Sequence, residues 1–264
     1  MFPDLFSVQG KTALVTGGSR GIGYMIAEGL LRAGARVYIS SRKADACAAA
    51  EKELSQYGQV KAIPADVSSE EQCRALIEEI SALESGRLHI LVNNAGATWG
   101  AAFDDFPDKA WDRVLGLNVK APFNLTRLAR PLLEAASAPD DPARVINIGS
   151  IDGMVVPGFG NFSYSASKAA IHHLTRHLAA ELSPAILVNA IAPGPFPSKM
   201  MEGPLKELGD QLVEASPVGR IGRTEDVAAA AVYLSSRATN YMTGAVIPLD
   251  GGLSTTLGIN LGGE

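Results

Sequence analysis

The 264-residue chain contains only two cysteines, Cys47 and Cys73, and both fall in stretches with a helical pattern. Two cysteines placed in this way do not make a disulfide framework, and we expect a reducing compartment, the cytoplasm. No stretch approaches about 18 consecutive apolar residues, so no membrane span is predicted. The first six residues have no basic flank followed by an apolar run, and we expect no signal peptide.

Runs of charge of one sign are also missing. The 28 acidic and 23 basic residues are mixed along the chain, and the formal net charge is −5. A nucleic-acid partner requires a basic patch or stripe, so we expect none. His172, His173 and His177 lie close together, and two of them have a spacing of four, but no third metal ligand is evident. We interpret these histidines as residues of a helix surface or a subunit contact and predict no metal site.

What the sequence has instead is a regular alternation of short β-rich runs and helical patterns. Several of the β-rich runs are unbroken apolar stretches, as strands of a sheet covered on both faces require. The alternation predicts an α/β fold with a doubly wound parallel sheet of seven strands, in one domain over residues 1–264. The expected strands are 12–16, 36–40, 60–65, 90–93, 144–149, 186–192 and 245–248. The expected helices are 21–33, 44–57, 69–83, 107–136, 164–182 and 224–235.

Two segments interrupt this alternation. Residues 193–218 contain five prolines and show no strong period. We interpret them as a mobile flap over a binding cleft, the alternative being an inert surface excursion. Residues 138–142 form a short acidic loop before the fifth strand.

A glycine-rich turn joins the first strand to the first helix, and its glycines are Gly17, Gly21 and Gly23. Glycine allows a tight turn and a close approach of the backbone to a ligand. The free N–H groups and the positive dipole end of the following helix suit a pyrophosphate. Because the turn lies between a strand and an amphipathic helix in a βαβ chain, it predicts a nucleotide-binding site.

The end of the second strand indicates which dinucleotide binds. A site that selects NAD usually places Asp or Glu there to bind the ribose 2′-hydroxyl, but this chain has Ser41 followed by Arg42. Arg20, in the glycine turn, can approach the same pocket. Two guanidinium groups and a hydroxyl suit a 2′-phosphate, so NADP(H) is favoured. The alternative is that Arg42 stacks on the adenine and both cofactors bind.

Tyr164 and Lys168 have the spacing that places a phenol and an ammonium on one helix face. A free phenol has a pKa of about 10, and a nearby positive charge lowers it. The pair could therefore exchange a proton with an alcohol or ketone oxygen. Taken alone, the pattern is also typical of a half-buried aromatic beside a solvated lysine.

Together, these motifs resemble the short-chain dehydrogenase/reductase family over about residues 10–252, in the order in which that family has them. The resemblance implies a Rossmann-type fold. It also implies a homotetramer, or a dimer, formed through the helices at 107–136 and 164–182. The cofactor-binding residues that it implies are Gly17, Ser19, Arg20, Gly21, Ile22, Gly23, Ser41, Arg42, Asp66, Val67, Asn93, Ala95, Gly96, Tyr164, Lys168, Pro193, Gly194 and Ser198.

The same resemblance implies four catalytic residues. Tyr164 would exchange a proton with the substrate oxygen. Lys168 would lower the pKa of Tyr164 and bind the nicotinamide ribose. Ser150 would hold the substrate oxygen by a hydrogen bond. Asn118 would order a water that links Lys168 to solvent. These roles imply an NADP(H)-dependent oxidoreductase that interconverts a ketone and a secondary alcohol.

The residues expected to line the cleft are mostly apolar, and Asp152 would repel an anion. We therefore expect an uncharged or amphipathic small-molecule carbonyl as substrate. Within the family the chain looks most similar to 3-oxoacyl-thioester (β-ketoacyl) reductases, including the type associated with rhamnolipid synthesis. The alternatives are a polyol, sugar or steroid alcohol dehydrogenase, or a non-catalytic regulatory protein that binds cofactor.

One feature argues against an acyl carrier protein as the carrier of the substrate. Family reductases that act on this acidic carrier tend to be basic just before the fifth strand and after the catalytic helix. This chain has Asp140-Asp141 and Ser183-Pro184 there. An acidic loop facing an acidic carrier would weaken docking, which leaves a coenzyme A thioester, a small ketone or a polyol.

Overall fold

The computed structural model describes residues 2–256, so the remainder of the predicted 1–264 domain lies outside the described residues. One parallel sheet has the strand order β3-β2-β1-β4-β5-β6-β7. The strands are β1 (Thr12–Thr16), β2 (Arg36–Ser40), β3 (Val60–Ala62), β4 (Ile90–Asn93), β5 (Ala143–Ile148), β6 (Ile186–Pro193) and β7 (Val246–Leu249). The predicted α/β fold with a seven-stranded parallel sheet is confirmed.

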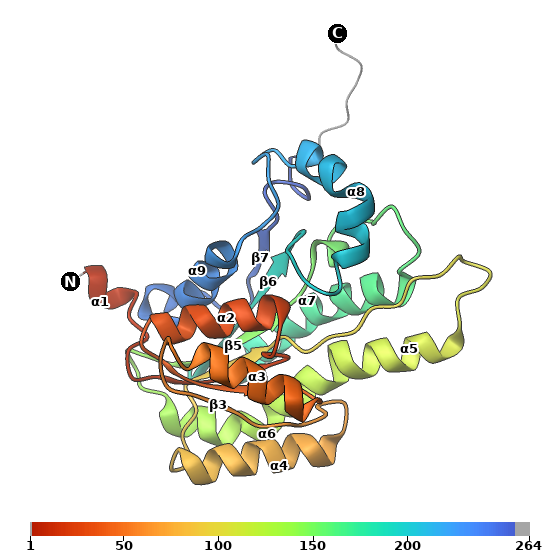
Figure 1. Cartoon of the computed structure of the whole chain (residues 1–264). Coiled ribbons are helices and arrows are strands. Elements are labelled where there is room, and N and C mark those ends of the chain that lie inside the picture. The colour runs from red at the N-terminus through yellow and green to blue at the C-terminus, as the bar shows by residue number, and fades with distance from the viewer. Residues whose placement is uncertain (1, 257–264) are drawn as a thin grey trace.

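Helices cover both faces of the sheet, as Figure 1 shows. On one face lie α2 (Gly21–Arg32), α3 (Ala44–Leu54) and α9 (Thr224–Ser235), and on the other lie α4 (Glu70–Leu83), α6 (Ala121–Ala136) and α7 (Phe162–Leu182). Successive strand residues alternate between the faces: Leu14 packs in one core cluster, and Ala13 and Val15 pack in the other. Each such aliphatic side chain stabilises the fold by roughly 1.5–3 kcal/mol when fully buried.

The helix predicted at 107–136 is divided in the structure. It consists of α5 (Asp108–Leu115), a π-helical turn (Gly116–Lys120) and α6. Pro122 has no N–H to donate to the carbonyl oxygen of Asn118, so a continuous α-helix would lose a hydrogen bond at this point. The π-helical turn contains Asn118, one of the predicted catalytic residues.

The predicted flap contains a helix that the sequence pattern does not reveal, α8 (Glu202–Ala215). Four of the five prolines in the segment lie outside this helix, and Pro204 lies in its first turn, where proline is tolerated. A further short helix, α1 (Phe2–Leu5), precedes β1. Within residues 2–256, no helix is long and apolar enough to cross a bilayer.

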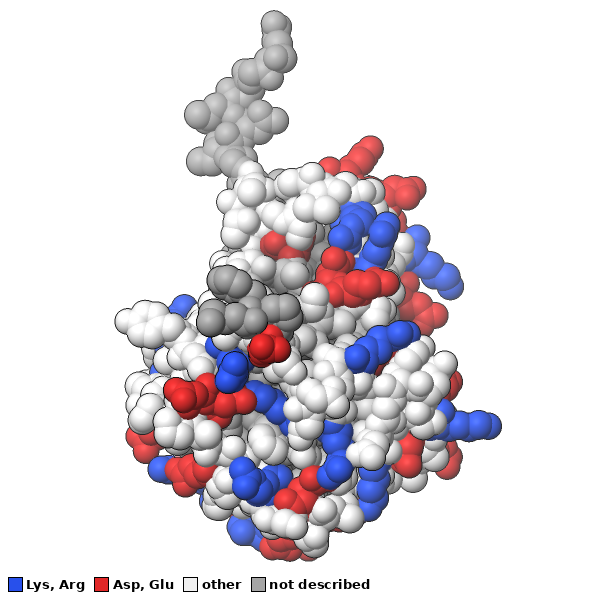
Figure 2. All heavy atoms as spheres, turned by 90° about the vertical axis from the view of Figure 1, so that its left-hand side faces the viewer, with Lys and Arg blue, Asp and Glu red and all other residues white. Residues whose placement is uncertain are grey.

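The chain reverses its direction across the sheet at β1, which pairs with β2 on one side and β4 on the other. In open α/β sheets the ligand crevice lies outside the carboxyl ends of the strands at such a reversal. The glycine turn follows β1 directly, and residues 94–97 follow β4 directly. Figure 2 shows acidic and basic side chains interspersed over the face that it presents.

Candidate active site

The four predicted catalytic residues come from three elements of the fold. Ser150 follows β5 in an extended conformation, Tyr164 and Lys168 lie on α7, and Asn118 lies in the π-helical turn. Ser150, Lys168 and Asn118 are buried, and Tyr164 is half-buried. Sheet and helix therefore hold the polar ends of these side chains with little freedom.

Tyr164 and Ser150 form a hydrogen bond through their side chains. Burial raises the pKa of Tyr164 to about 12, the hydrogen bond with Ser150 acts in the opposite direction, and the Asp152 carboxylate raises the pKa further. The prediction that the Tyr164 pKa is lowered is wrong for this structure, because burial outweighs the lowering by Ser150 and Asp152 acts in the same direction as burial. The phenol is consequently protonated at neutral pH and is suited to donate a proton.

Lys168 lies beside the tyrosine, with its Nζ 5.4 Å from the centroid of the Tyr164 ring. The ammonium donates a hydrogen bond to the carbonyl oxygen of Ile148, at 2.7 Å, which fixes it against the end of β5. Burial lowers the pKa of Lys168 to about 8, and the charge of Asp152 opposes this effect. Lys168 is therefore positively charged at neutral pH but loses its proton at a lower pH than an exposed lysine.

Asp152 is a charged member of the site whose part the sequence does not reveal. Its carboxylate accepts a hydrogen bond from Asn161 Nδ2 at 2.8 Å, and burial raises its pKa. Its backbone N–H donates to Ser150 Oγ at 3.2 Å, and its carbonyl oxygen accepts from Ser165 Oγ at 2.6 Å. Asp152 thus links the serine turn to α7.

The Asn118 side chain ties the segment after β4 to α7. Its Oδ1 accepts from the Ala97 N–H at 2.8 Å. Its Nδ2 donates to the Ala97 carbonyl oxygen and to Ser167 Oγ, each at 2.9 Å. This side chain therefore supports the wall of the cleft, and its predicted role in ordering a water stays a prediction.

The glycine turn is fixed by Asn94, a residue that we did not single out, rather than by the side chain of Asn93. Asn94 Nδ2 donates to the carbonyl oxygens of Thr16 and Gly17, at 2.9 and 3.3 Å. Gly17 has a φ of +66°, and a methyl group added there would lie 2.8 Å from Asn94 Nδ2. The turn therefore requires glycine for its conformation and for this close contact.

Asn93 lies one residue earlier, on β4, and its side chain is buried inside the fold. It donates from Nδ2 to Asn147 Oδ1 at 2.9 Å and to Thr126 Oγ1 at 3.2 Å. The structure therefore places the Asn93 side chain in a polar network between sheet and helix. The change of side-chain direction at the end of a strand is the signal that could have distinguished the two asparagines.

The residues predicted to bind the 2′-phosphate follow the neighbouring strands β1 and β2, and the Gly18 N–H donates to the Ser40 carbonyl oxygen at 3.2 Å. Arg20 and Arg42 are exposed, and Ser41 is half-buried with its Oγ 3.2 Å from the Cys47 sulfur. Burial raises the pKa of Asp66, but hydrogen bonds from Ser68 and the charge of Arg42 outweigh it, so that the pKa is lowered overall. The guanidinium of Arg42 thus acts on the Asp66 carboxylate.

The remaining predicted cofactor residues lie along the same edge of the sheet. A methyl group added at Gly21 would lie 3.2 Å from the Ser198 Cβ, so the start of the flap packs against the glycine turn. Gly194 follows Pro193 at the end of β6, and its N–H donates to the Leu249 carbonyl oxygen at 3.0 Å. The others follow β1, β3 or β4, and they are Ser19, Ile22, Gly23, Val67, Ala95 and Gly96.

The histidines of α7 do not form one group. His173 and His177 are exposed, with ring centroids 5.3 Å apart. His172 is buried, so its interpretation as a surface or contact residue is wrong. It lies on the face of α7 that carries Lys168, four residues further along. Within residues 2–256, no group of three or more His, Cys, Asp or Glu side chains could hold a metal ion.

Comparison with known proteins places the chain in a family. A family model described as Enoyl-(Acyl carrier protein) reductase matches residues 17–254. The chain is 51% identical to the rhamnolipids biosynthesis 3-oxoacyl-[acyl-carrier-protein] reductase of Pseudomonas aeruginosa, over 94% of this chain and 97% of that protein. It is 36% identical to the gluconate 5-dehydrogenase of Gluconobacter oxydans, over 97% of this chain and 99% of that protein.

A solved structure gives the same result. The Pseudomonas aeruginosa RhlG/NADP active-site complex matches this fold with a TM-score of 0.92 at 49% sequence identity, covering 95% of this chain and 99% of that one. The glycine turn, the Tyr164–Lys168 spacing and the order of the seven strands agree with these matches. The chain therefore belongs to the short-chain dehydrogenase/reductase family of oxidoreductases.

Proposed function

We propose that the chain is an NADPH-dependent reductase that converts the ketone of a 3-oxoacyl thioester to a secondary alcohol. The observation that carries the proposal is the placement of the Tyr164 phenol, which interacts with the Ser150 side chain and has the Lys168 Nζ 5.4 Å from the centroid of its ring. This arrangement provides a proton donor, a hydrogen-bonding partner for the substrate oxygen and a positive charge in one place. The name of the Pseudomonas relative supports the substrate class.

The residues at the glycine turn fit a dinucleotide. Helix α2 begins at Gly21, so its first N–H groups lie at the glycine turn, where Gly17 and Gly21 supply the positive φ values that the turn has. Arg20, Ser41 and Arg42 would hold the 2′-phosphate. The NADP complex of the Pseudomonas relative supports this choice. When bound, NADPH supplies the hydride, and the chain supplies geometry and the proton.

The chain's own part in the reaction is proton transfer. Ser150 holds the substrate carbonyl oxygen, and Tyr164 donates its phenolic proton to that oxygen as negative charge develops on it. The positive charge of Lys168 then stabilises the phenolate that is left. Asn118 is proposed to order the water through which the proton is replaced.

The apolar rim of the cleft supports an acyl substrate. Between Ser150 and Tyr164 the chain exposes five large apolar side chains, and Val156 is 95% exposed. Exposed apolar side chains that gather in this way are typical of ligand-binding surfaces. The five residues are Met154, Val155, Val156, Phe159 and Phe162. A charged sugar acid would gain little from such a rim.

The acidic loop gives no reason to exclude a carrier protein. Asp141 accepts a hydrogen bond from Lys11 Nζ at 2.6 Å and lies 3.8 Å from the Arg144 guanidinium. The loop also precedes β5, whereas Ser150 follows that strand at the opposite edge of the sheet. Asp141 is thus neutralised within its own chain, and coenzyme A and carrier-protein thioesters both stay possible substrates.

A steady-state comparison of substrates tests the proposal. NADPH oxidation is measured with one 3-oxoacyl group on coenzyme A and on acyl carrier protein, with a keto sugar acid, and with a keto steroid. We expect the highest kcat/KM with a 3-oxoacyl thioester. A higher kcat/KM with the sugar acid or the steroid would contradict the proposed 3-oxoacyl thioester and would assign the substrate to that other class. No oxidation with any carbonyl, together with tight NADPH binding, would indicate a non-catalytic protein.

The pH dependence of the reaction follows from Lys168. Because its pKa is lowered to about 8, it is charged below that pH and neutral above it. Tyr164, with a pKa of about 12, stays protonated over the same range. We expect the rate of carbonyl reduction to fall as the pH rises through about 8. Initial rates between pH 6 and 10 measure this.

Lys168→Arg is the matched control for the pH profile, because arginine keeps its charge throughout this range. Whatever its absolute rate, this variant should show no fall near pH 8. A fall of equal size in the variant would assign the titration to another group.

We also propose that the chain acts as one domain in a homotetramer, or a dimer, in the cytoplasm, with residues 193–218 as its substrate flap. The two free cysteines support the compartment.

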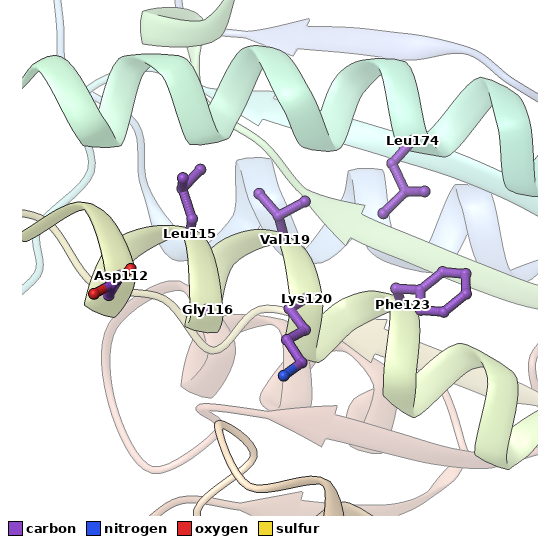
Figure 3. Close-up of a pocket in the computed structure, with 7 residues that line it drawn as sticks. All are labelled: Asp112, Leu115, Gly116, Val119, Lys120, Phe123 and Leu174. Carbon is purple, nitrogen blue, oxygen red and sulfur yellow. The ribbon is translucent and has the colours of Figure 1, made fainter.

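A groove of about 690 Å³ runs along the π-helical turn and α7 and supports the proposed assembly, and Figure 3 shows Leu115, Val119 and Leu174 around it. Its lining is Asp112, Leu115, Gly116, Val119, Lys120, Phe123 and Leu174. A second copy of the chain would cover it.

Phe123→Glu tests this assembly. Phe123 is 43% exposed in the single chain, and a charge placed in a desolvated contact costs about 2 kcal/mol or more, roughly 30-fold in the dissociation constant. We expect light scattering after gel filtration to show a smaller species. Leu83→Glu, at an equally exposed apolar residue at the end of α4, should leave the mass unchanged. Unchanged mass in both variants would contradict the proposed contact.

A further inference from the structure

His172 is a buried titratable residue for which the proposed mechanism has no use. It lies on α7, four residues beyond Lys168, and is 5% exposed. The spacing places it on the same helix face as Tyr164 and Lys168, one turn further along. Its ring is therefore directed toward the end of β5, behind the catalytic side chains.

The ring packs against the backbone just before the catalytic serine. A methyl group added at Gly149 would overlap His172 Nε2 and lie 2.7 Å from Cδ2. The Gly149 N–H donates to the Ile191 carbonyl oxygen at 2.7 Å, which fixes the opposite side of this backbone on β6. Gly149 is thus held between the sheet and the histidine ring, and Ser150 follows it directly.

His172 also contacts the far end of the serine turn. It forms a hydrogen bond with the backbone of Gly153, the last residue of the 3₁₀ turn Ile151–Gly153. Gly153 itself packs on α7, where a methyl group would lie 2.5 Å from the Lys168 carbonyl carbon. One side chain therefore holds both ends of the turn that begins at Ser150.

The ring is neutral at the pH of catalysis. Burial, followed by the charges of Lys168 and Arg176, lowers the pKa of His172 to about 4. A neutral imidazole has one N–H, and Nε2 finds no hydrogen-bond partner among residues 2–256. We assign this N–H to Nδ1, the remaining nitrogen, as the donor to the Gly153 backbone.

We propose that His172 is a positioning residue, which fixes the turn from Gly149 to Gly153 and so directs the Ser150 hydroxyl toward the substrate carbonyl oxygen. The inference rests on the proposed function, because His172 acts only through Ser150. A misplacement of about 1 Å at a reacting group can lower a rate by about 100-fold. The loss should fall on kcat, since His172 does not lie at the glycine turn.

His172→Leu and His172→Asn form the test. Leucine fills a similar volume without a donor, whereas the asparagine Nδ2 can donate from near the place of the histidine Nδ1. We expect His172→Leu to lower kcat by about 10- to 100-fold with an unchanged dissociation constant for NADPH. His172→Asn should keep kcat within about threefold of the original chain. The unsubstituted chain is assayed on the same carbonyls, and its turnover tests the proposed function separately from the role of His172.

A kcat for His172→Leu equal to that of the original chain would overturn the inference. So would an equal loss in both variants, or a loss accompanied by weaker NADPH binding, because each would indicate general structural damage.

A second variant pair keeps the inference testable if His172→Leu fails to fold. Gly149→Ala should lower kcat, because its methyl group overlaps the His172 ring. The φ of Gly149 is not positive, so alanine suits the backbone there. In a His172→Ala background, Gly149→Ala should lower kcat by a smaller factor, and a double-mutant cycle measures this difference. Strictly additive effects on kcat would overturn the proposed contact.

Discussion

Tyr164→Phe is expected to lower kcat for carbonyl reduction by about 10²- to 10⁴-fold, the contribution of a positioned proton donor. The substitution removes one hydroxyl and leaves the ring, which lies at the start of α7 beside Lys168. Because the Tyr164 pKa is about 12, the hydroxyl carries its proton at neutral pH, and phenylalanine has none to give. Stopped-assay and continuous measurements of NADPH oxidation determine kcat.

Binding of NADPH separates a catalytic loss from a structural one. The glycine turn and Asn94 directly follow β1 and β4, and their contacts do not involve the Tyr164 hydroxyl. We therefore expect the dissociation constant of NADPH, measured by fluorescence, to change by less than about threefold. Tyr24→Phe is the matched control, because its hydroxyl bonds to Glu53 at 3.3 Å on the surface. Substantial turnover by Tyr164→Phe would refute the proposed mechanism.

Most of the sheet could be predicted from the sequence because its strands are buried on both faces. Strands with this burial consist of unbroken apolar runs, and the bounds of β1, β2 and β4 agree with the predicted ones. Helix α8 could not be predicted in this way. Leu205, Leu208 and Leu212 have a helical spacing, but the helix also contains two glycines and a proline, which are poor helix formers, and further prolines lie on both sides of it. The division of α5 from α6 could not be predicted from proline alone, because Pro131 lies inside α6 without interrupting it.

The site was predicted at the level of residue types and spacing, but not at the level of its electrostatics. Tyr164 and Ser150 are joined as their roles require, yet the Tyr164 pKa is raised rather than lowered. Burial is the larger effect, and burial depends on how α7 packs against β5, which spacing alone does not encode. His172 was missed because we grouped it with His173 and His177, although its spacing of four from Lys168 places it on the inward face of α7.

Asn94 was missed for a different reason. Asn93 and Asn94 are adjacent and chemically identical, so their roles are separated only by the direction of each side chain. Asn93 points into the buried network with Asn147, whereas Asn94 points to the glycine turn. The two side chains point in different directions because β4 ends at Asn93 and Asn94 is the first residue beyond the strand.

The second large effect concerns the choice between NADPH and NADH. Arg20 and Arg42 are exposed, and neither forms an ion pair within 4.0 Å among residues 2–256. Both guanidinium groups are therefore available to a 2′-phosphate, together with the Ser41 hydroxyl of the proposed pocket. A hydrogen bond to a charged group contributes about 1.5–3 kcal/mol. Removal of both guanidinium groups should lower kcat/KM for NADPH by roughly 10²- to 10⁴-fold.

The double variant Arg20→Ala/Arg42→Ala is therefore expected to lose NADPH turnover but to keep its kcat/KM with NADH, which has no 2′-phosphate. Raised salt should weaken NADPH binding to the original chain more than to the variant, because it screens exposed charges. Arg130→Ala, at an exposed arginine paired with Glu134 at 2.7 Å, is the matched control. An equal loss with both cofactors would mean that the arginines contact the adenine, which both share, and the preference for NADP(H) would then require another source.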